Sequence, residues 1–406
     1  MAVRRGEPDR PLHIGLLAPA IPASGIANGI VTYTRIMRDA LRAQGHQVSI
    51  LTAFDYEDER GEPHKRAPEG LVRSGLASLR GRLDRARRSR RISPGPFIAT
   101  LREVNARLPL DVLEMEESFG WSRDLMGRGP TIVTRLHGPH IYGKDDLETD
   151  EERATSEQRI VDEGRSLAVI RALTSPSARL LKATLDHYRV RPPIAETIPN
   201  PIPVAPPAER WSLGRADPDQ LLCVGRFDTR KGADVVVEAF QRALRQRPGL
   251  RLVMVGPDPG LTQPDGGRVH FADHVRTLSP EARERIDYLG RRSAEEIAEL
   301  RLRSAFTIIG SRFENFPYSL AESMAIGAPS IVSDSFGNGE MVIDGETGLV
   351  VPIGDSEAMA AGILRLRDNP GALAEMGDRA YRRCAEWLDP DRVARETVAL
   401  YRRAGA

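Results

Sequence analysis

Short apolar runs rich in β-branched residues alternate with helical patterns along the whole chain. The first run, LHIGLLAP (12–19), is followed by a glycine-containing loop and a helical pattern at 29–45 that stops at Gly45. Further runs of this kind lie at 46–53, 111–116, 131–138 and 167–177. Strands that are apolar on both faces and lead into helices are typical of a parallel sheet covered by helices. The pattern predicts a doubly wound α/β fold.

Proline becomes dense at IPNPIPVAPPAER (198–210), which has the composition of a linker. The alternation then restarts, with apolar runs at 221–227, 251–257, 286–290, 306–311, 329–334 and 348–352. A chain of 406 residues is too long for one ordinary core. We therefore expect two Rossmann-like domains, residues 1–200 and 201–388. Ligands of such sheets bind at the carboxyl ends of the strands, so the cleft between two facing domains is the expected site.

Composition narrows the class of protein. A charged content of 28% and a hydrophobic content of 40% are those of a globular protein, and the net charge of +1 carries no nucleic-acid signature. The cysteines, Cys223 and Cys384, fit neither a zinc pattern nor a disulfide framework. The opening lacks the apolar core of a signal peptide, and no apolar run reaches membrane-spanning length. We expect a cytoplasmic protein of enzyme size that has no nucleic-acid partner; the oligomeric state is unknown.

Residues 71–91 form an unusual segment with eight arginines and one acid. Leu76, Leu79 and Leu83 recur in it at helical spacing. One interpretation is a helix on a membrane surface, which would give peripheral contact with the inner membrane face and favour a lipid-linked acceptor. The other is a solvated or disordered insertion. The narrow apolar stripe, which has no aromatic residue, favours the second interpretation.

The loop GRFDTRKG (225–232) follows an expected strand and precedes a helical pattern. Arg226 and Lys231 therefore lie at the carboxyl end of a strand, beside a helix N-terminus. Two cations, free main-chain N–H groups and the positive end of a helix form a phosphate-binding site. The spacing differs from the Walker pattern. The alternative is an exposed, solvated loop, but Lys231 is one of only four lysines in the chain.

The segment SRFENFPYSLAESMAIG (311–327) places two carboxylates, Glu314 and Glu322, in apolar surroundings. Proline is favoured in the first helical turn, so Pro317 predicts Glu314 on a loop and Glu322 inside a helix. A buried carboxylate needs a partner, and no Lys or Arg of this segment lies within helical reach of Glu322. Two ribose hydroxyls beside a diphosphate would satisfy it. The alternative is an ion pair with a distant arginine in the core.

Together these segments resemble the donor-site signature of retaining GT-B-fold glycosyltransferases of the sucrose- and glycogen-synthase-like branch (glycosyltransferase family 4-like, group 1). The pattern S-x-x-E-x-x-P-x-x-L-x-E-x-M-A-x-G matches 311–327, and G-R-x-x-x-x-K-G matches 225–232. IPNPIP (198–203), the stretch 28–52 and the stretch 339–355 also resemble family segments in the expected order. The resemblance implies two Rossmann-like domains facing each other across a cleft, with a C-terminal helix, 389–406, that packs back on the N-terminal domain.

The resemblance also assigns roles to single residues. Arg226 and Lys231 would neutralise the leaving diphosphate, Glu314 would face the donor sugar, and Glu322 would bind the ribose hydroxyls. His137, in RLHGP at a strand end, matches the histidine that touches the donor sugar, although a lone histidine is more often structural. The remaining donor contacts would come from Gly29, in a loop that closes over the diphosphate, and from the main chain around Asn315, Phe316, Pro317, Ser319 and Leu320.

The expected phosphate loops carry no DxD-like metal site. Fixed cations and helix ends can stabilise a leaving group electrostatically, so we expect a metal-independent reaction without a cofactor. The resemblance implies retention by same-face attack, in which a donor phosphate oxygen takes the acceptor's proton; Glu314 as a nucleophile is a minority alternative. We expect a hexose-type UDP-sugar as donor. GDP- and ADP-sugars stay open because no base-reading residue is evident.

The acceptor is expected on the N-terminal domain. LEMEESFGW (113–121) ends a strand and offers Glu117 and Ser118, and an acidic stretch at 142–152 follows His137. Acidic edges suit a small-molecule or glycan acceptor with hydroxyl or amino groups; a solvated acidic face is the alternative. Two other classes of protein stay open. A nucleotide-sugar epimerase or hydrolase would act without an acceptor, and a non-catalytic sugar-nucleotide-binding partner subunit would be free to lose Lys231 or Glu322.

Overall fold

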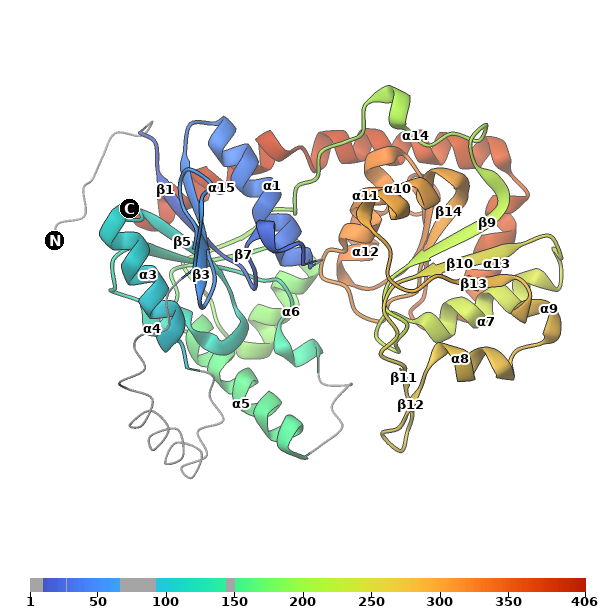
Figure 1. Cartoon of the computed structure of the whole chain (residues 1–406), viewed down its shortest axis with the longest axis horizontal. Coiled ribbons are helices and arrows are strands. Elements are labelled where there is room, and N and C mark those ends of the chain that lie inside the picture. Colours follow the sequence, from blue (N-terminus) through green and yellow to red (C-terminus); the bar gives the residue numbers. More distant parts are fainter. Residues whose placement is uncertain (1–9, 27, 66–92, 144–149) are drawn as a thin grey trace. The chain divides into compact units, whose positions relative to one another are not determined.

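The computed structural model describes residues 10–26, 28–65, 93–143 and 150–406. It divides into two compact units, Met1–Pro201 with Pro390–Ala406, and Ile202–Asp389. Each unit has a central sheet with helices packed on it (Figure 1). The arginine-rich segment 71–91 and the greater part of the acidic stretch 142–152 lie outside the described residues. Within the described ranges, no helix combines the length and apolar character that a membrane crossing requires.

The first unit is built on an eight-stranded sheet. Its strands are, in spatial order, β4 (Pro63–Lys65), β3 (Asp55–Glu57), β2 (Gln47–Leu51), β1 (His13–Leu17), β5 (Val112–Glu116), β6 (Thr131–Arg135), β7 (Ala172–Ser175) and β8 (Ile194–Thr197). Its helices are α1 (Gly29–Ala43), α3 (Gly95–Arg107), α4 (Ser122–Leu125), α5 (Asp150–Leu167), α6 (Ala178–Tyr188) and α15 (Pro390–Gly405). Short 3-10 turns are η1 (Pro22–Ser24), η3 (Ser118–Gly120) and η4 (His140–Tyr142).

The second unit is built on a six-stranded sheet in which every pairing is parallel. Its strands are, in spatial order, β13 (Ile286–Tyr288), β10 (Arg251–Val255), β9 (Asp217–Val224), β14 (Ser304–Ile309), β15 (Ser330–Ser333) and β16 (Leu349–Val351). Its longer helices are α7 (Ala233–Leu244), α10 (Ala294–Arg303), α11 (Tyr318–Ile326), α13 (Ser356–Arg367) and α14 (Pro370–Trp387). Shorter elements are η6 (Pro207–Glu209), the hairpin β11 (Leu261–Thr262) and β12 (Arg268–Val269), α8 (Phe271–His274), η7 (Val275–Thr277), α9 (Pro280–Arg283) and α12 (Phe336–Met341).

Both sheets are doubly wound, as the alternating pattern predicts. In the first, the chain leaves β1 toward β2 and returns to its other side as β5; in the second, it leaves β9 toward β10 and returns as β14. At such a switch point the loops after the two neighbouring strands diverge and leave room for a ligand. The expected site loops follow β9 and β14 in one unit, and β1, β5 and β6 in the other.

The first sheet is parallel as predicted except at one edge, where two short strands that were not predicted are added. The strands β3 and β4 pair antiparallel, with β3 also antiparallel to β2. Their connection is a tight polar turn in which the Asp58 carboxylate accepts the N–H groups of Arg60 and Glu62, at 3.0 and 2.9 Å. The short, polar strands DYE and PHK lack the apolar run that marks a buried parallel strand, which is why the sequence did not reveal them.

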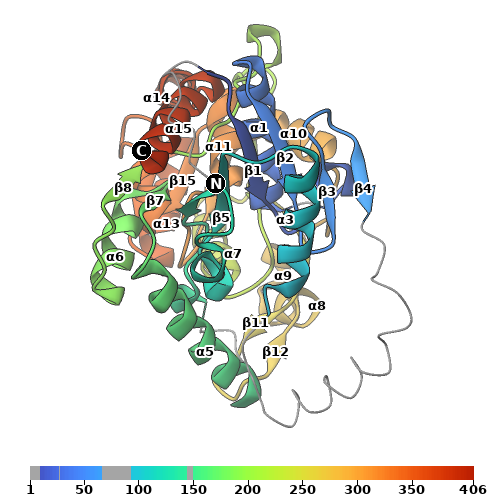
Figure 2. The same ribbon diagram turned by 90° about the vertical axis from the view of Figure 1, so that its left-hand side faces the viewer.

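The helix predicted at 29–45 is confirmed as α1. Its N-cap is Asn28, whose side chain accepts the Ile30 N–H at 2.8 Å, and Gly45 follows it in the left-handed region with φ 83°. The helix α1 contacts α15, whose buried residues include Val393, Ala394 and Tyr401. Figure 2 labels both helices.

The proline-dense segment is better ordered than a linker. The Arg135 guanidinium donates to the Ile198 and Pro199 carbonyls, at 2.9 and 3.3 Å. Beyond the unit boundary, the Ile202 N–H donates to the Leu388 carbonyl at 3.0 Å, and the Ala205 N–H donates to the Ala325 carbonyl of α11 at 2.9 Å. The composition therefore marks the boundary, while the main chain on either side of it is bound to its own unit.

A close approach of two glycines joins the loops after β9 and β14. Gly232 caps the start of α7 with φ 64°, and a Cβ on it would lie 1.9 Å from the Gly310 carbonyl oxygen. Only glycine combines this φ with this approach at low cost. Because Gly232 has no side chain, the two loops can pack directly against each other.

Replacing Gly232 by alanine should lower the stability of the protein strongly. The left-handed φ alone costs on the order of 1–3 kcal/mol, and the overlap with Gly310 adds to it. The thermal unfolding midpoint measures the effect. Gly371→Ala is the matched control, because Gly371 lies in the first turn of α14 with open space around it, so it should leave the midpoint unchanged or slightly raised. Equal midpoints for the two variants would contradict this account of the loop contact.

Candidate functional site

In the second unit, the loops after β9 and β14 bring Lys231 and Glu314 together. The Lys231 ammonium donates to Glu314 Oε1 at 2.5 Å, and the Ser311 hydroxyl donates to the same oxygen at 2.8 Å. The Glu314 side chain is buried, whereas that of Lys231 keeps 27% of its surface exposed. A buried carboxylate is tolerable with such partners. The pair thus presents a partly exposed cation at the carboxyl edge of the sheet.

Arg226 lies on the same loop and forms an ion pair with Asp228. Asp228 is fully buried, and its other oxygen accepts the Lys231 N–H at 2.7 Å. One carboxylate therefore fixes the side chain of Arg226 and the main chain of Lys231. Sequence reasoning selected both cations and missed the acid between them, which stands in the quoted motif GRFDTRKG.

A second ion pair fastens the two loops. Arg312 binds Asp234, in the first turn of α7, through two hydrogen bonds of 2.8 and 2.6 Å, and it also donates to the Thr229 carbonyl at 2.6 Å. Together with the contact between Gly232 and Gly310, this bridge holds Lys231 opposite Glu314. Sequence spacing could not reveal this pairing, because Arg312 and Asp234 are 78 residues apart.

The prediction that Glu314 lies on a loop and Glu322 inside a helix is confirmed, since α11 begins at Tyr318 with Pro317 as its N-cap. Asn315, Phe316 and Pro317 are buried and lead into this helix. The main chain of this segment packs closely against Gly337. The Gly337 N–H donates to the Glu314 carbonyl at 3.0 Å, and a Cβ on Gly337 would lie 1.8 Å from the main-chain oxygen of Asn315.

One main-chain donor expected for phosphate is already committed. The Leu320 N–H donates to the Pro317 carbonyl at 3.1 Å, and the Leu320 side chain is fully buried in the core. Ser319 is the second residue of α11 and half-buried, and the first N–H groups of a helix have no partner inside it. The main-chain N–H of Ser319 can therefore still bind an anion at the start of α11. The expectation that the Leu320 N–H binds phosphate is corrected.

The idea that Glu322 is buried without a protein partner is wrong. Its side chain is 41% exposed and pairs with Arg301 of α10, which is only 4% exposed. The buried member of the pair is the arginine, and burial lowers its pKa. The alternative of an ion pair with a distant arginine is what the structure shows. It does not remove the carboxylate from solvent, so Glu322 remains a fixed, accessible acceptor of hydrogen bonds.

In the first unit, His137 and Glu117 are brought together after β6 and β5. Both Glu117 oxygens accept main-chain hydrogen bonds, from the N–H of His137 at 2.9 Å and of Gly138 at 2.8 Å. Glu117 is 1% exposed. This corrects the expectation that Glu117 contacts an acceptor, because its oxygens are used to hold the histidine loop. Ser118, next to it, is half-buried and bonds to the Glu116 carboxyl, which has a raised pKa caused by burial.

His137 keeps a neutral imidazole. Its side chain is half-buried at the surface, but the surrounding protein and the nearby Arg135 guanidinium lower its pKa to about 3. The ring packs edge-on against Tyr33 with 5.3 Å between centroids. Gly29 is exposed at the first position of α1, one helical turn before Tyr33. A neutral imidazole can donate one hydrogen bond and accept another near neutral pH, but it carries no charge to a ligand.

A buried network missed by the sequence supports this histidine. The Tyr33 hydroxyl donates to Glu114 at 2.7 Å, and the Tyr401 hydroxyl of α15 donates to the other Glu114 oxygen at 2.9 Å. The Arg135 guanidinium lies 4.4 Å from the centre of the Tyr33 ring and is fully buried. The available signals were a glutamate and an arginine inside otherwise apolar strand sequences, DVLEME and TIVTR.

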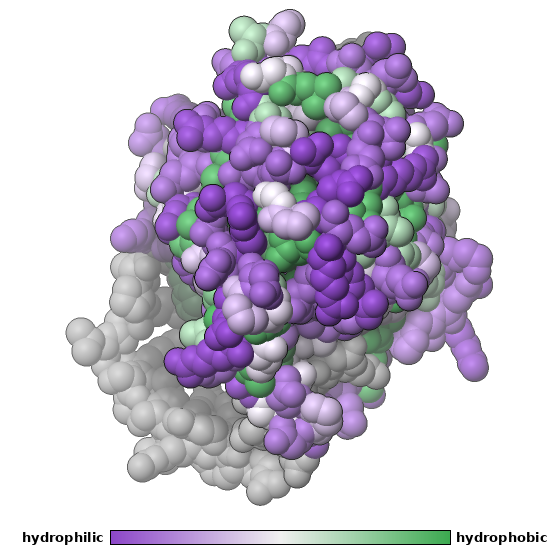
Figure 3. All heavy atoms as spheres, turned by 90° about the vertical axis from the view of Figure 1, so that its right-hand side faces the viewer, coloured by the Kyte–Doolittle hydropathy of each residue, from purple (hydrophilic) through white to green (hydrophobic). Residues whose placement is uncertain are grey.

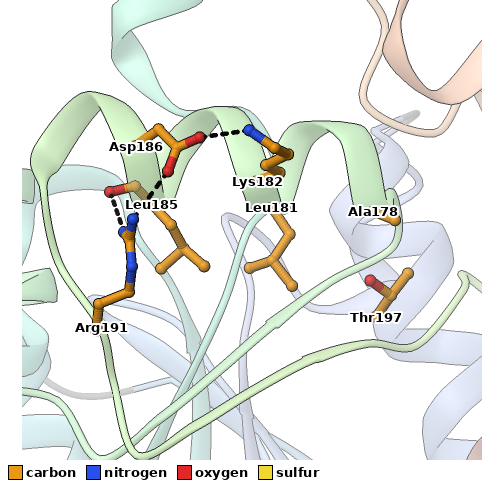
Figure 4. Close-up of a pocket in the computed structure, with 7 residues that line it drawn as sticks. All are labelled: Ala178, Leu181, Lys182, Leu185, Asp186, Arg191 and Thr197. Carbon is orange, nitrogen blue, oxygen red and sulfur yellow. Dashed lines mark hydrogen bonds and ion pairs between the residues drawn. The ribbon is translucent and has the colours of Figure 1, made fainter.

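Two further findings concern possible ligand sites. Among the described residues, no group of three His, Cys, Asp or Glu side chains is arranged to hold a metal ion. That finding does not bear on the expected metal independence, which stays a prediction. A hollow of about 320 Å³ lies along α6 (Figure 4), but its charged residues neutralise one another, with Asp186 bound to both Lys182 and Arg191 at 2.6 and 3.0 Å. The molecular face in Figure 3 is dominated by hydrophilic residues.

Known families match both units. The family model of glycosyl transferases group 1 matches residues 207–383, and that of glycosyltransferase family 4 matches residues 27–205. A D-inositol 3-phosphate glycosyltransferase of Acidothermus cellulolyticus is 25% identical over 403 residues, which cover 93% of this chain and 87% of the relative.

Solved structures show the same fold. A sucrose-phosphate synthase of Thermosynechococcus elongatus has a TM-score of 0.72 at 22% identity, covering 97% of this chain and 98% of that one. An Anabaena protein solved in complex with UDP-glucose has a TM-score of 0.63 at 15% identity, covering 96% and 98%. These neighbours confirm the predicted GT-B architecture of two α/β domains with parallel sheets.

Removing Glu322 should destabilise the protein more than removing Arg301. Glu322→Ala leaves a buried guanidinium without its counter-ion, which costs about 1–3 kcal/mol or more, whereas Arg301→Met leaves a half-exposed carboxylate that water can solvate. The denaturant midpoints of the two variants measure the difference. A larger loss in Arg301→Met would contradict the assignment of the buried partner.

Stability should fall with rising pH because of Glu117. Burial, the Glu163 charge and the Glu116 charge raise its pKa to about 8, from an ordinary value of 4.5. The folded state therefore binds this proton more tightly than the unfolded chain does. Its contribution to stability is fully present below about pH 4.5 and is lost as the pH rises to about 8. Unfolding midpoints at about pH 5 and about pH 8 should differ more in the wild type than in Glu117→Gln; parallel changes in both would refute the assignment.

Proposed function

Because the chain belongs to the group 1, family 4-like glycosyltransferases, we propose that it moves a hexose-type sugar from a UDP-sugar to an acceptor hydroxyl or amino group with retained configuration. The observation that carries the proposal is the pairing of Lys231 with Glu314 at the switch point of the second sheet. A partly exposed lysine fixed at this edge suits a diphosphate, and the carboxylate paired with it suits the hydroxyls of the attached sugar. UDP as the nucleotide is supported by the family resemblance and by the UDP-glucose bound to the Anabaena neighbour.

The leaving group is where the second unit would act. As the bond between the anomeric carbon and the diphosphate oxygen breaks, the electron pair stays on that oxygen, and Lys231 and Arg226 would neutralise it. When the donor binds, the Lys231 ammonium would leave Glu314 and donate to a phosphate oxygen of the donor instead. This exchange would take place when the donor binds, so both cations would already be in position when the bond breaks, which is when fixed charges lower the barrier most effectively. We therefore propose a reaction that requires no metal ion.

The donor sugar and ribose would be held by the two carboxylates of the 311–327 segment. Glu314 is buried at the edge of the sheet and would accept sugar hydroxyls once Lys231 turns to phosphate. Glu322 is held by Arg301 and would accept the two ribose hydroxyls. The first residues of α11, with Ser319 among them, would offer N–H groups to the phosphates.

The first unit would supply His137 and the acceptor. A neutral imidazole can hydrogen-bond a hydroxyl of the donor sugar without repelling developing positive charge at the anomeric carbon. The acceptor oxygen or nitrogen would attack from the face that the diphosphate leaves, and its proton would pass to a donor phosphate oxygen. This route needs no protein nucleophile. The acceptor's class, a small molecule, a glycan or a lipid-linked sugar, is left open by the residues described.

Thermal-shift measurements with UDP, GDP, ADP and TDP test the donor assignment. We expect UDP to raise the unfolding midpoint, since a ligand that binds only the folded state stabilises it, and the shift should be the same with and without magnesium. Lys231→Ala should lose the shift. Lys182→Ala is the matched lysine control, because Lys182 is an exposed residue of α6 paired with Asp186, and it should keep the full shift.

The outcomes separate the remaining interpretations. A shift that depends on magnesium would overturn metal independence, and a full shift in Lys231→Ala would remove the phosphate assignment. Conversion of a UDP-sugar without any added acceptor, faster than transfer, would favour an epimerase or hydrolase. The anomeric configuration of the transferred sugar, read by proton NMR, decides between retention and inversion.

A further inference from the structure

The loop that carries His137 is held along its main chain by two buried carboxylates. Glu117 accepts the N–H groups of His137 and Gly138, at 2.9 and 2.8 Å. Glu163 of α5 accepts the N–H of His140 with both oxygens at 3.1 Å, and the Tyr188 hydroxyl donates to it at 2.7 Å. Pro139 has no N–H, so all three N–H groups between 137 and 140 end on carboxylates.

The turn that delivers Glu117 is strained and is clamped by α5. Phe119 has φ 68°, which is unusual for a residue with a side chain, and the Arg159 guanidinium lies 4.4 Å from the centre of its ring. A Cβ on the next residue, Gly120, would lie 2.3 Å from the Asp162 carbonyl oxygen. Backbone strain persists only where the surrounding structure enforces it, and it concentrates at functional sites. Here the enforcement comes from the same helix that carries Glu163.

The charge balance of this cluster is unfavourable. Glu116, Glu117 and Glu163 face one cation, Arg159, and burial together with their mutual repulsion raises the pKa of Glu117 to about 8 and that of Glu163 to about 7. Burying carboxylates in this way lowers stability. The main-chain N–H groups that donate to Glu117 and Glu163 all belong to the loop of His137. The cluster therefore lowers the stability of the protein but holds this loop in place.

The imidazole is held from the other side as well. The Tyr33 ring meets it edge-on at 5.3 Å, and Tyr33 itself is fixed by its bond to Glu114 and by the Arg135 guanidinium over its ring. Main chain and ring of His137 are therefore positioned independently, by Glu117 and by Tyr33.

We propose that Glu117 is a positioning residue that acts through His137: its two oxygens set the main chain of the histidine so that the neutral imidazole meets the donor sugar. This inference rests on the proposed function. Glu163 supports the same loop at His140. A displacement of about 1 Å at a catalytic group can reduce the rate about 100-fold, so the loss of one of two such bonds should be visible in turnover.

The test is Glu117→Gln with UDP-glucose as donor and UDP release as readout. A glutamine offers one accepting oxygen, and its NH2 group would face a main-chain N–H, so one of the two loop bonds is lost. Because the pKa of Glu117 is raised to about 8, the assay is run at about pH 9, where the wild-type side chain is ionised. Under this condition we expect kcat to fall about 10- to 100-fold with the KM for UDP-glucose changed less than about 3-fold. Hydrogen exchange of the 137–140 amides should rise in the same variant, which reads the loop directly and without activity.

Two controls separate positioning from a general loss of structure. Glu116→Gln removes a neighbouring carboxylate whose hydrogen-bond partner is Ser118 and not the His137 loop, and its kcat should stay within about 2-fold of the wild type. The double variant Glu117→Gln with His137→Ala should be no slower than His137→Ala alone, because a residue that acts through another contributes nothing once that residue is gone.

The pH profile adds a third readout. Ionised Glu117 is the stronger acceptor, so wild-type kcat should rise as the pH passes about 8, and the rise should be absent in Glu117→Gln. The titratable groups that face Glu117 are Glu116, Glu163, Arg159 and Tyr188. Burial and the Glu163 charge raise the pKa of Tyr188, so its hydroxyl stays protonated, and His137 is neutral throughout this range.

The outcomes are distinct. An unchanged kcat in Glu117→Gln with impaired His137→Ala overturns the positioning role and leaves the proposed function standing. Additive losses in the double variant also overturn it. An active His137→Ala shows that His137 is not needed and removes the positioning role with it. A wild type that releases no UDP from UDP-glucose and transfers from no nucleotide sugar overturns the proposed function itself.

Discussion

The approach of Gly232 to the carbonyl of Gly310 is the constraint on which the second unit's site depends. The two loops come from strands that are neighbours in space and separated by about eighty residues in sequence. A side chain between them would force them apart. With the side chain absent, Arg312 can reach Asp234 across the gap, and Lys231 can reach Glu314. The electrostatics of the site therefore follow from a steric fact of the main chain.

In the first unit, the surrounding residues hold the neutral His137 ring in a fixed orientation. They do so with charges that have been taken out of solvent: Arg135 beneath Tyr33, Glu114 between two tyrosine hydroxyls, and Glu117 under the histidine loop. Buried charged groups add little net stability, but the hydrogen bonds that they make fix a geometry. The imidazole stays uncharged because the protein packed around it and the nearby Arg135 guanidinium lower its pKa.

Much of the fold could be predicted from the sequence because apolar runs and glycine stops report burial directly. Apolar runs of this kind predicted the strands β9 and β6, which Lys231 and His137 follow. The antiparallel strands β3 and β4 escaped because their polar residues carry no burial signal. The site could be predicted only as far as its motif residues. Their partners, such as Arg301 for Glu322 and Glu163 for His140, lie on other elements, and sequence spacing does not encode contacts across a fold.

Arg135 also explains how a proline-dense stretch can be fastened at all. Proline has no N–H to donate, so a segment such as IPNPIP can be bound through its carbonyls but offers few donors of its own. Arg135 supplies donors to the carbonyls of Ile198 and Pro199 and to the Asn200 side-chain oxygen. One buried guanidinium thus acts as the donor that the segment lacks. The prolines could vary in number and place there without loosening the attachment, provided that the carbonyls keep their positions.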